Sequence, residues 1–386
     1  MADASIDTAQ SSLLEAPTET ATPQTPAIVQ VAKEYGVSPV RQMRDIMGLR
    51  FGARKMSGAE YYSLRLFDPA RADKASFTGQ NGINALNASM NPPMAVPTRA
   101  FVGNKLLYTE LLAKLGIATS HTQALVSTFR TLGTLPVLKD AQTLVDFLRN
   151  DAKYPLFGKP HHGSLSEGSV RINGTDGDEL LMANGRRIGV EQFAKDVFAQ
   201  YPGGFMIQTA LDPHADMAHI AGPAVGCVRV VTVNDGTGAK PAYALWKMPA
   251  PDAMSDNFWQ HGSLLAMLDL ASGTVTTCNR GAGLETETFD DHPVSGVAVV
   301  GQTLPFWAET LQMATDAHAV FPEFGVCGFD IAVTADGPKV LECNDNPSHM
   351  LYQLASGKGV NNADLAPVWA AVATRQTKQL ARLKGK

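Results

Sequence analysis

The feature that most constrains the fold is a strand–turn–strand pattern near the C-terminus, which covers residues 329–344. Two mostly apolar runs flank Asp336 and Gly337, and a turn sequence of this kind is typical of an antiparallel hairpin. Similar patterns precede it over residues 227–248 and 264–278. We therefore expect an antiparallel sheet in the C-terminal half of the chain.

The last hairpin carries three side chains with oxygen donors. If its turn holds an odd number of residues, Asp330 lies opposite Glu342, and Glu342 shares a strand face with Asn344 because these two residues are two apart. Two carboxylates beside a carboxamide suit a Mg²⁺ ion that is held jointly with phosphate oxygens. The alternative is an acidic hairpin edge that faces solvent.

A lysine lies at the end of the apolar strand expected over residues 155–160, and a loop rich in glycine and serine follows over residues 161–169. Lys159 needs an anionic partner there, and the loop would let backbone N–H groups approach phosphate oxygens. The loop is not a Walker A sequence, and an ordinary Gly/Ser turn would have a similar composition. His161 and His162 are adjacent and point to opposite faces in an extended chain, which argues against a zinc site.

Two further basic residues interrupt apolar strands. Arg229 lies in the run over residues 228–233, and Lys247 lies near the end of the run over residues 243–248. An unpaired charge in a strand of the core would be costly. Two explanations are open, namely bound phosphate and a salt bridge to one of the carboxylates of the last hairpin.

The rest of the chain mixes helices with strands. Helical spacing of apolar residues predicts helices over residues 105–115, 141–149, 190–200 and 305–320. Residues 27–100 are predicted to be mostly helical and include a polar, Asn-rich stretch. Residues 1–26 carry few large apolar side chains, so we expect a flexible tail there.

Charge and cysteine usage exclude several classes of protein. The formal net charge is -5 and the Lys and Arg residues are scattered, which argues against a nucleic acid partner. No apolar run reaches the roughly 18 residues of a transmembrane helix, and the N-terminus lacks a signal-peptide pattern, so we expect a cytoplasmic protein without a membrane span. The four cysteines lack CxxC spacing and lie in apolar stretches, which predicts reduced thiols in the core.

Taken in order, these segments resemble the ATP-grasp superfamily, and more closely its sugar-transfer-associated group, which is related to α-L-glutamate ligases. The resemblance runs from about Phe101 to Lys358. The segments that carry it are residues 104–107, 154–160 with the loop that follows, 205–208, 228–232, 304–307 and, above all, 328–347.

The resemblance implies an α+β ATP-grasp fold, in which two α+β subdomains with antiparallel sheets grip ATP after a mostly helical N-terminal region. The implied parts are a tail (1–26), the helical region (27–100), a subdomain with the lysines and the Gly/Ser lid (101–204), a subdomain with the metal ligands (205–375) and a basic C-terminal end (376–386).

The resemblance also implies roles for individual residues. Those that would bind ATP are Lys105, Lys159, His161, Gly163, Ser164, Ser166, Gly168, Gln208, Thr209, Leu211 and Asp216. Those expected in catalytic positions near the reacting phosphate are Arg229, Lys247 and Asn257. Those that would bind Mg²⁺, with Mn²⁺ as the alternative, are Asp330, Glu342 and Asn344. Gln208 and Lys247 depart from the family, where glutamate and arginine are more usual, and this bears on nucleotide preference.

The activity that the resemblance implies is that of an ATP-dependent carboxylate–amine ligase. Such an enzyme forms an amide or peptide bond through an acyl phosphate, here in polysaccharide or secondary-metabolite biosynthesis, and its substrates would be a small-molecule acid and an amine. Two alternatives are open, namely an ATP-dependent phosphotransferase and a regulatory module that binds ATP without turnover.

Overall fold

The computed structural model of the chain describes residues 13, 26–52, 54–71, 73–91, 96–163, 166–250, 253–256 and 262–383. The chain forms two compact units. Unit 1 comprises residues 1–18, 120–211 and 252–257, and unit 2 comprises residues 19–119, 212–251 and 258–386. Neither unit is continuous in sequence, because the chain passes between them several times.

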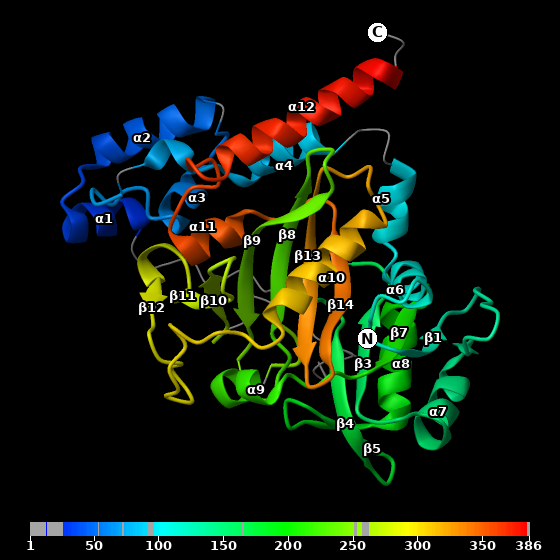
Figure 1. The fold of residues 1–386 in the computed structure, drawn as a ribbon. Coiled ribbons are helices and arrows are strands. Elements are labelled where there is room, and N and C mark those ends of the chain that lie inside the picture. Colours follow the sequence, from blue (N-terminus) through cyan, green and yellow to red (C-terminus); the bar gives the residue numbers. More distant parts are fainter. Residues whose placement is uncertain are drawn as a thin grey trace, which may run out of the picture. The chain divides into compact units, whose positions relative to one another are not determined.

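Unit 1 contains a seven-stranded sheet with the order β2-β1-β7-β3-β4-β5-β6 (Figure 1). Its strands are β1 (Thr122–Val126), β2 (Val137–Leu138), β3 (Leu156–Pro160), β4 (Val170–Asp176), β5 (Glu179–Met182), β6 (Arg187–Gly189) and β7 (Phe205–Thr209). All neighbouring strands are antiparallel except β1 and β2, which are parallel.

Two helices cover one face of this sheet, α7 (Ala141–Asn150) and α8 (Val190–Gln200). Leu144 and Leu148 on α7 and Phe193 and Val197 on α8 are each four residues apart, so each pair forms an apolar stripe, and all four are buried in one core with the strands. Asp140 caps α7, since its side chain accepts a hydrogen bond from the backbone N–H of Thr143 at 2.8 Å.

Unit 2 contains a second seven-stranded sheet, in which all neighbouring strands are antiparallel and the order is β12-β11-β10-β9-β8-β13-β14. Its strands are β8 (Cys227–Asn234), β9 (Ala239–Met248), β10 (Leu264–Leu268), β11 (Val275–Arg280), β12 (Glu287–Thr288), β13 (Val326–Thr334) and β14 (Gly337–Asn344). The order places β8 and β13, about 100 residues apart in sequence, side by side.

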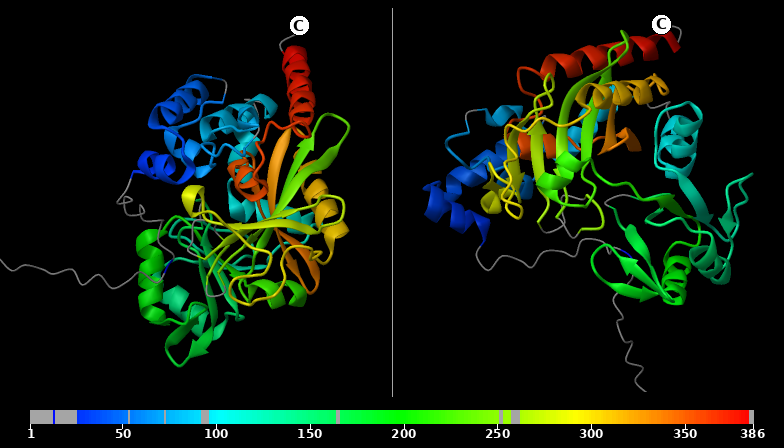
Figure 2. Two further views of the ribbon diagram at one scale, coloured as in Figure 1. Left: turned by 90° about the vertical axis from the view of Figure 1, so that its left-hand side faces the viewer. Right: turned by 60° about the horizontal axis from the view of Figure 1, so that its bottom comes forward.

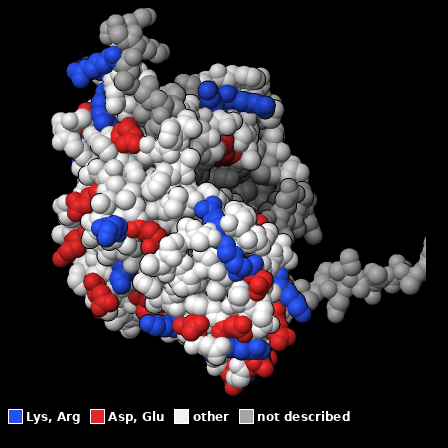
Figure 3. Space-filling view, turned by 90° about the vertical axis from the view of Figure 1, so that its right-hand side faces the viewer, with Lys and Arg blue, Asp and Glu red and all other residues white. Residues whose placement is uncertain are grey.

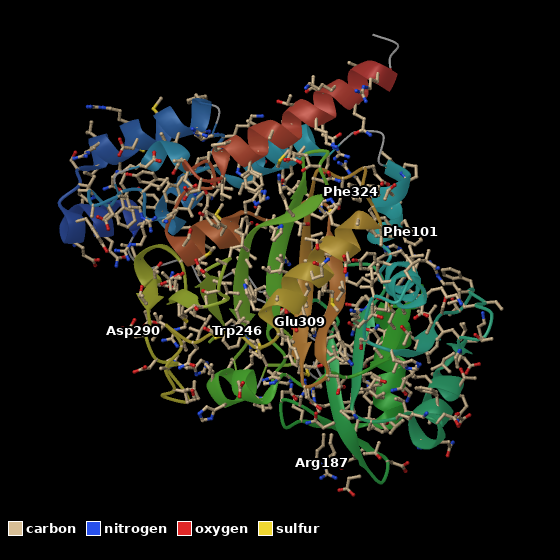
Figure 4. All side chains as sticks on the ribbon, in the orientation of Figure 1. Phe101, Arg187, Trp246, Asp290, Glu309 and Phe324 are labelled. Atoms are coloured by element: carbon tan, nitrogen blue, oxygen red, sulfur yellow. The ribbon has the colours of Figure 1, made fainter. Side chains whose placement is uncertain are left out.

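Helices cover both faces of the second sheet. On one face, α6 (Lys105–Lys114), α9 (Ala215–Ala221) and α10 (Trp307–Ala319) enclose a core that includes Trp246 and Phe324, both labelled in Figure 4. On the other face, α4 (Gln80–Met90), α11 (Met350–Ser356) and α12 (Ala366–Leu383) pack against the alternate strand residues. The left view in Figure 2 shows α10 and α11 on opposite sides of the sheet.

The N-terminal part of unit 2 is helical. It comprises α1 (Ala27–Tyr35), α2 (Pro39–Phe51), α3 (Gly58–Ser63), a short 3₁₀ helix (Lys74–Ser76), α4 and α5 (Val96–Val102). Ser38 caps α2 and Ser57 forms a capping box with Glu60, so side chains define where these helices begin. Val31, Tyr61 and Phe67 are buried in a separate small core. None of the described helices is long and apolar enough to cross a membrane.

The α+β fold with two mostly antiparallel sheets and a helical N-terminal region is confirmed, as is the burial of all four cysteines as free thiols. The units divide the chain differently from the parts expected from the sequence. The strand β7 lies in the centre of the first sheet, and Lys105 belongs to unit 2. The expected tail lies outside the described residues except for Leu13, which is buried in the core of unit 1, and Pro26.

Candidate functional site

Three neighbouring strands of unit 2 bring polar side chains into one row. Arg229 on β8 lies opposite Asp330 on β13, and Asp330 lies opposite Glu342 on β14. Residues directly opposite each other point to the same face of a sheet, so the three side chains share a face. This is the face that α4, α11 and α12 cover elsewhere along the strands.

Asp330 is the centre of a buried ion cluster. Its two carboxylate oxygens accept hydrogen bonds from Arg229 Nε and Nη2, the latter at 2.7 Å, and Lys247 Nζ lies 3.0 Å from Oδ2. Burial raises the pKa of the Asp330 carboxyl, but the positive charges of Arg229 and Lys247 outweigh that effect and hold the pKa well below its usual value. Of the two explanations left open by the sequence, the salt bridge is present, and it joins both basic residues to the same carboxylate.

Glu342 forms the more exposed end of the row. Its side chain is 32% exposed, compared with 5% for Asp330. Lys105, at the first position of α6, places Nζ 3.7 Å from Glu342 Oε2, and Asn344 Nδ2 donates to Glu342 Oε1 at 3.3 Å. Lys105, Glu342 and Asn344, which the sequence assigns to phosphate and metal binding, are thus neighbours.

The donors of this cluster fit a Mg²⁺ ion at Glu342 and Asn344. Among the described residues, no group of three or more His, Cys, Asp and Glu side chains lies close enough together to hold a metal ion, and this set has only two carboxylates. Both oxygens of Asp330 are engaged by Arg229 and Lys247. These three hydrogen bonds use three of the roughly four acceptor sites of the carboxylate, so direct binding of the ion by Asp330 stays a prediction.

Asparagine side chains of α4 and of the residue after it hold the loop that follows β14. Asn87 Nδ2 donates to Asn346 Oδ1 at 2.8 Å and to the Pro347 carbonyl at 2.9 Å. Asn91 Nδ2 donates to the carbonyls of Asp345 at 2.5 Å and Val326 at 2.9 Å. This role could not be predicted from the sequence, because asparagines in a polar stretch give no sign of their distant partners.

Replacing Asn91 by alanine is expected to lower the free energy of unfolding by about 2–4 kcal/mol. The side chain is buried, and its Oδ1 also accepts from the backbone N–H groups of Gly325 and Val326 at 2.8 and 2.9 Å, so its loss leaves several backbone groups unsatisfied. Urea unfolding measures the change. Asn81→Ala, at an exposed position of α4, is the control and should change it by less than about 0.5 kcal/mol. Equal effects of the two variants would contradict this role for Asn91.

His349 lies fully buried at the end of the same loop. Its Nδ1 is 2.7 Å from Tyr243 Oη and its Nε2 is 2.8 Å from Asn87 Oδ1. Burial lowers the pKa of His349 to about 3, and the positive charge of Arg229 adds to the shift. A second buried histidine of unit 2, His318, has its pKa lowered to about 4, mainly by burial.

These two histidines are expected to make unit 2 sensitive to acid. Below about pH 6.5 the unfolded chain binds a proton on each histidine that the folded chain does not bind until about pH 3–4, so stability falls as the pH falls. The free energy of unfolding should drop by about 2–3 kcal/mol between about pH 7 and about pH 5.5. Urea unfolding at several pH values tests this. The dependence of the unfolding free energy on pH should weaken in His349→Gln, by less than half because burial also lowers the pKa of His292. It should stay unchanged in His162→Gln, where the residue is exposed.

In unit 1, Lys159 and Gln208 share the sheet face that points away from α7 and α8. Lys159 lies opposite Met206, and Phe157 lies opposite Gln208, while Ile207 points into the core on the other face. Gln208 is buried, and its Nε2 donates to the Ser120 carbonyl at 3.5 Å and to Thr122 Oγ1 at 3.4 Å. A glutamate could not donate to these acceptors, which gives a physical reason for the departure from the family at this position.

Backbone groups near the end of β7 are already used within unit 1. The Thr209 N–H donates to the His121 carbonyl at 2.9 Å, and the Thr209 carbonyl accepts from Ser120 Oγ at 2.7 Å. The Leu211 carbonyl accepts from Arg171 Nη1 at 2.5 Å. Each carbonyl keeps a second lone pair, so contacts of Thr209 and Leu211 with adenine stay a prediction.

The Gly/Ser loop begins at a buried anchor. His161 Nδ1 lies 2.9 Å from the Gly204 carbonyl and its Nε2 lies 3.2 Å from Arg130 Nη2, so its ring ties the loop to the residues before β7. The φ angles are 131° at Gly163, 57° at Ser166 and 75° at Gly168, where a Cβ would lie 2.5 Å from Tyr201 Oη. A glycine is therefore required at position 168.

For three predicted site residues, no place in the clusters above is assigned. Ser164 and Asn257 lie outside the described residues. Asp216 lies in the first turn of α9 in unit 2, where its carboxylate is exposed and 3.5 Å from His214 Nδ1.

On the face that Figure 3 shows, Lys and Arg side chains are interspersed with Asp and Glu.

Several enzymes of known structure are similar to this chain in fold. They include the D-alanine-D-alanine ligase from Coxiella burnetii (14% identity, TM-score 0.43, 74% of this chain and 60% of that chain covered) and an L-amino acid ligase from Bacillus licheniformis (13%, 0.42, 77% and 52%). A biotin carboxylase complex from Campylobacter jejuni is a further example (10%, 0.41, 76% and 51%). The chain thus spans between half and two thirds of the length of these proteins. No curated protein matches it.

A family model matches most of the chain. The model describes the sugar-transfer associated ATP-grasp family, and it matches residues 84–366, which include the part of α4 from Asn84 onward and the site residues Arg229, Asp330, Glu342 and Asn344. The chain belongs to the sugar-transfer associated ATP-grasp family.

Proposed function

We propose that the protein is an ATP-dependent ligase that activates a carboxylate by phosphorylation and joins it to an amine. The observation that carries the proposal is the row of Arg229, Asp330 and Glu342 across β8, β13 and β14, with Lys105 and Lys247 beside it. Anionic oxygen donors next to fixed cations form a site that suits a metal ion together with phosphate groups. Membership in an ATP-grasp family makes Mg-ATP the reactant of choice.

The residues of the row would have different roles in binding Mg-ATP. Glu342 and Asn344 would hold Mg²⁺, which neutralises charge on phosphate oxygens when it is bound. Lys105, 3.7 Å from Glu342, would bind a phosphate oxygen beside that ion. Asp330 fixes Arg229 and Lys247 in place through its hydrogen bonds, so their charges are oriented before the reaction and need no rearrangement during it.

The chemistry needs no nucleophile from the protein. A carboxylate oxygen of the acid attacks the γ-phosphorus of ATP, the bond from that phosphorus to the bridging oxygen breaks, and ADP leaves. The amine then attacks the acyl carbon and phosphate leaves as the amide forms. Positioning and charge neutralisation by Lys105, Arg229 and Lys247 would supply the catalysis. In unit 1, we assign Lys159, Gln208 and the Gly/Ser loop to ATP binding on the family resemblance.

Trapping of the activated acid tests this function. The protein is incubated with Mg-ATP, hydroxylamine and a panel of amino acids and sugar acids, the latter because the family is described as sugar-transfer associated. We expect ADP release and a hydroxamate with one class of acid, and neither without ATP. A phosphorylated product that is stable to hydroxylamine would indicate a phosphotransferase instead. Tight Mg-ATP binding with no turnover on any acid would favour the regulatory module.

A further inference from the structure

The helix α2 exposes a stripe of large apolar side chains. Val40 is 71% exposed, Met43 50%, Met47 54% and Phe51 79%. These are four of the eleven large apolar side chains exposed among the described residues, and they lie on a helix of 13 residues. Clustering of this kind marks an interaction surface, whereas single exposed apolar residues are ordinary.

The stripe follows one side of the helix. At about 100° per residue, the four side chains fall within a sector of about 80°. The side that packs onto the protein is different: Gln42 is fully buried, and Ile46 and Leu49 pack against the small N-terminal core. Gln42 Nε2 donates to the carbonyls of Val37 at 2.7 Å and Ile28 at 3.0 Å. These contacts fix the rotation of α2, so the stripe faces away from the core of unit 2.

Basic side chains flank the stripe on both sides. Arg50 lies at one border of the apolar sector, and Arg44 and then Arg41 lie at the other, and all three are exposed. Residues 38–55 hold five basic residues and a single acidic one, in a chain whose formal net charge is -5. That acidic residue, Asp45, lies 3.8 Å from Lys74 and accepts from Tyr61 Oη at 3.4 Å. The exposed part of α2, with three arginines and one aspartate, is therefore cationic.

We propose that α2 binds the surface of a membrane that contains anionic lipids. An apolar stripe bordered by arginines on a helix is typical of helices that lie in the plane of the interface, with the apolar side chains among the acyl chains and the cations at the headgroups. The charge of α2 is complementary to that of anionic headgroups. In Figures 1 and 2, α2 lies on the outer side of the N-terminal helices. This proposal is independent of the activity proposed above.

Vesicle binding by the full chain tests the proposal. The probes are vesicles of phosphatidylcholine alone and vesicles in which part of it is replaced by phosphatidylglycerol. We expect sedimentation with the anionic vesicles only, and a loss of about tenfold in the partition coefficient for Phe51→Ser. The matched control is Phe129→Ser in unit 1. Phe129 is 69% exposed, and Arg130 lies 6.0 Å from its ring centre, as Arg50 does from that of Phe51.

A separate pair of variants tests the electrostatic contribution of the arginines to vesicle binding. The double variant Arg44→Gln with Arg50→Gln should lose about fivefold in partitioning for each arginine, and added salt should weaken wild-type binding. The control removes the same charge from exposed positions of α12, Lys378→Gln with Arg382→Gln, and should bind as wild type does. Equal losses in the two double variants would show that net charge alone drives binding and would overturn the assignment to α2.

A fluorescent label reports whether α2 itself enters the interface. All four native cysteines are buried, so Met47→Cys can be labelled selectively with an environment-sensitive dye. We expect a blue shift with anionic vesicles for this variant and none for Val294→Cys, an exposed site elsewhere in unit 2. The absence of vesicle binding at low salt would overturn the proposal. Concentration-dependent dimerisation that Phe51→Ser abolishes, without vesicle binding, would assign the stripe to a second copy of the chain.

Discussion

Asp330→Ala is expected to lower the free energy of unfolding by about 3–5 kcal/mol. The substitution removes the carboxylate that Arg229 and Lys247 share and leaves both cations in a buried place. A buried charge that loses its partner is far more costly than the same loss at the surface, because no water replaces the interaction. Urea unfolding of the variant measures the effect, and it should be among the largest of any single substitution in unit 2.

Two further variants separate this effect from simple loss of a side chain. Asp176→Ala removes one of the two exposed carboxylates that pair with Arg187, labelled in Figure 4. It should have far less effect, because both pairs lie at the surface. Combining Asp330→Leu with Arg229→Met and Lys247→Met should restore much of the lost stability, because all three charges of the buried cluster are then removed together. A small effect of Asp330→Ala would show that water reaches the two cations.

The cluster also predicts a response to acid. Because the folded-state pKa of Asp330 is held below its usual value, the stability that the ion cluster provides is present at neutral pH. It is lost as the pH falls below about 4 and through that lowered pKa. The acid limb of the wild-type stability curve should therefore be steeper than that of the triple apolar variant.

Glu342→Gln is expected to reduce kcat/KM for ATP turnover by a factor of about 10³ or more. The variant keeps the shape of the side chain but removes the negative charge that would hold Mg²⁺ beside Lys105. Steady-state kinetics at increasing Mg²⁺ concentrations measure the loss, and the apparent affinity for Mg²⁺ should fall as well. Stability should change little, since the side chain is partly exposed and its pair with Lys105 is 3.7 Å long.

A matched control is available on α10. Glu309, labelled in Figure 4, is an exposed glutamate of the same unit, and Glu309→Gln should leave turnover unchanged. Turnover by Glu342→Gln within about tenfold of wild type would remove Glu342 from the metal site and leave Asp330 and Asn344 as the remaining ligands to test.

The row of site residues could be predicted from the sequence only in part. Alternation along the last hairpin was enough to place Glu342 and Asn344 on one face, and the opposition of Asp330 and Glu342 is confirmed. The two residues lie opposite each other for a different reason than the odd-numbered turn considered above. The turn is even, since Thr334 pairs with Gly337, and an irregularity of register between Asp330 and Ile331 shifts the pairing by one residue. A bulge of this kind leaves no mark in the composition of the strand.

Contacts between residues far apart in the chain could not be predicted from the sequence. The two explanations for Arg229 and Lys247 could not be separated, because their partner Asp330 is 101 and 83 residues away. The role of Asn87 and Asn91 depends on a loop more than 230 residues later. The helix α12 is not among the helices predicted above, although Leu365, Trp369 and Val372 have helical spacing and are all buried. This spacing of apolar residues was sufficient to predict a helix there.

The transfer of oxygen from the acid to phosphate tests the central claim most directly. The acid that yields a hydroxamate is labelled with ¹⁸O in its carboxylate and incubated with Mg-ATP and the amine acceptor, and the released phosphate is analysed by mass spectrometry. If the protein activates a carboxylate through an acyl phosphate, one labelled oxygen appears in each phosphate formed with product. Phosphate without label, formed alongside product, would show that the carboxylate never attacks the γ-phosphorus and would contradict the account.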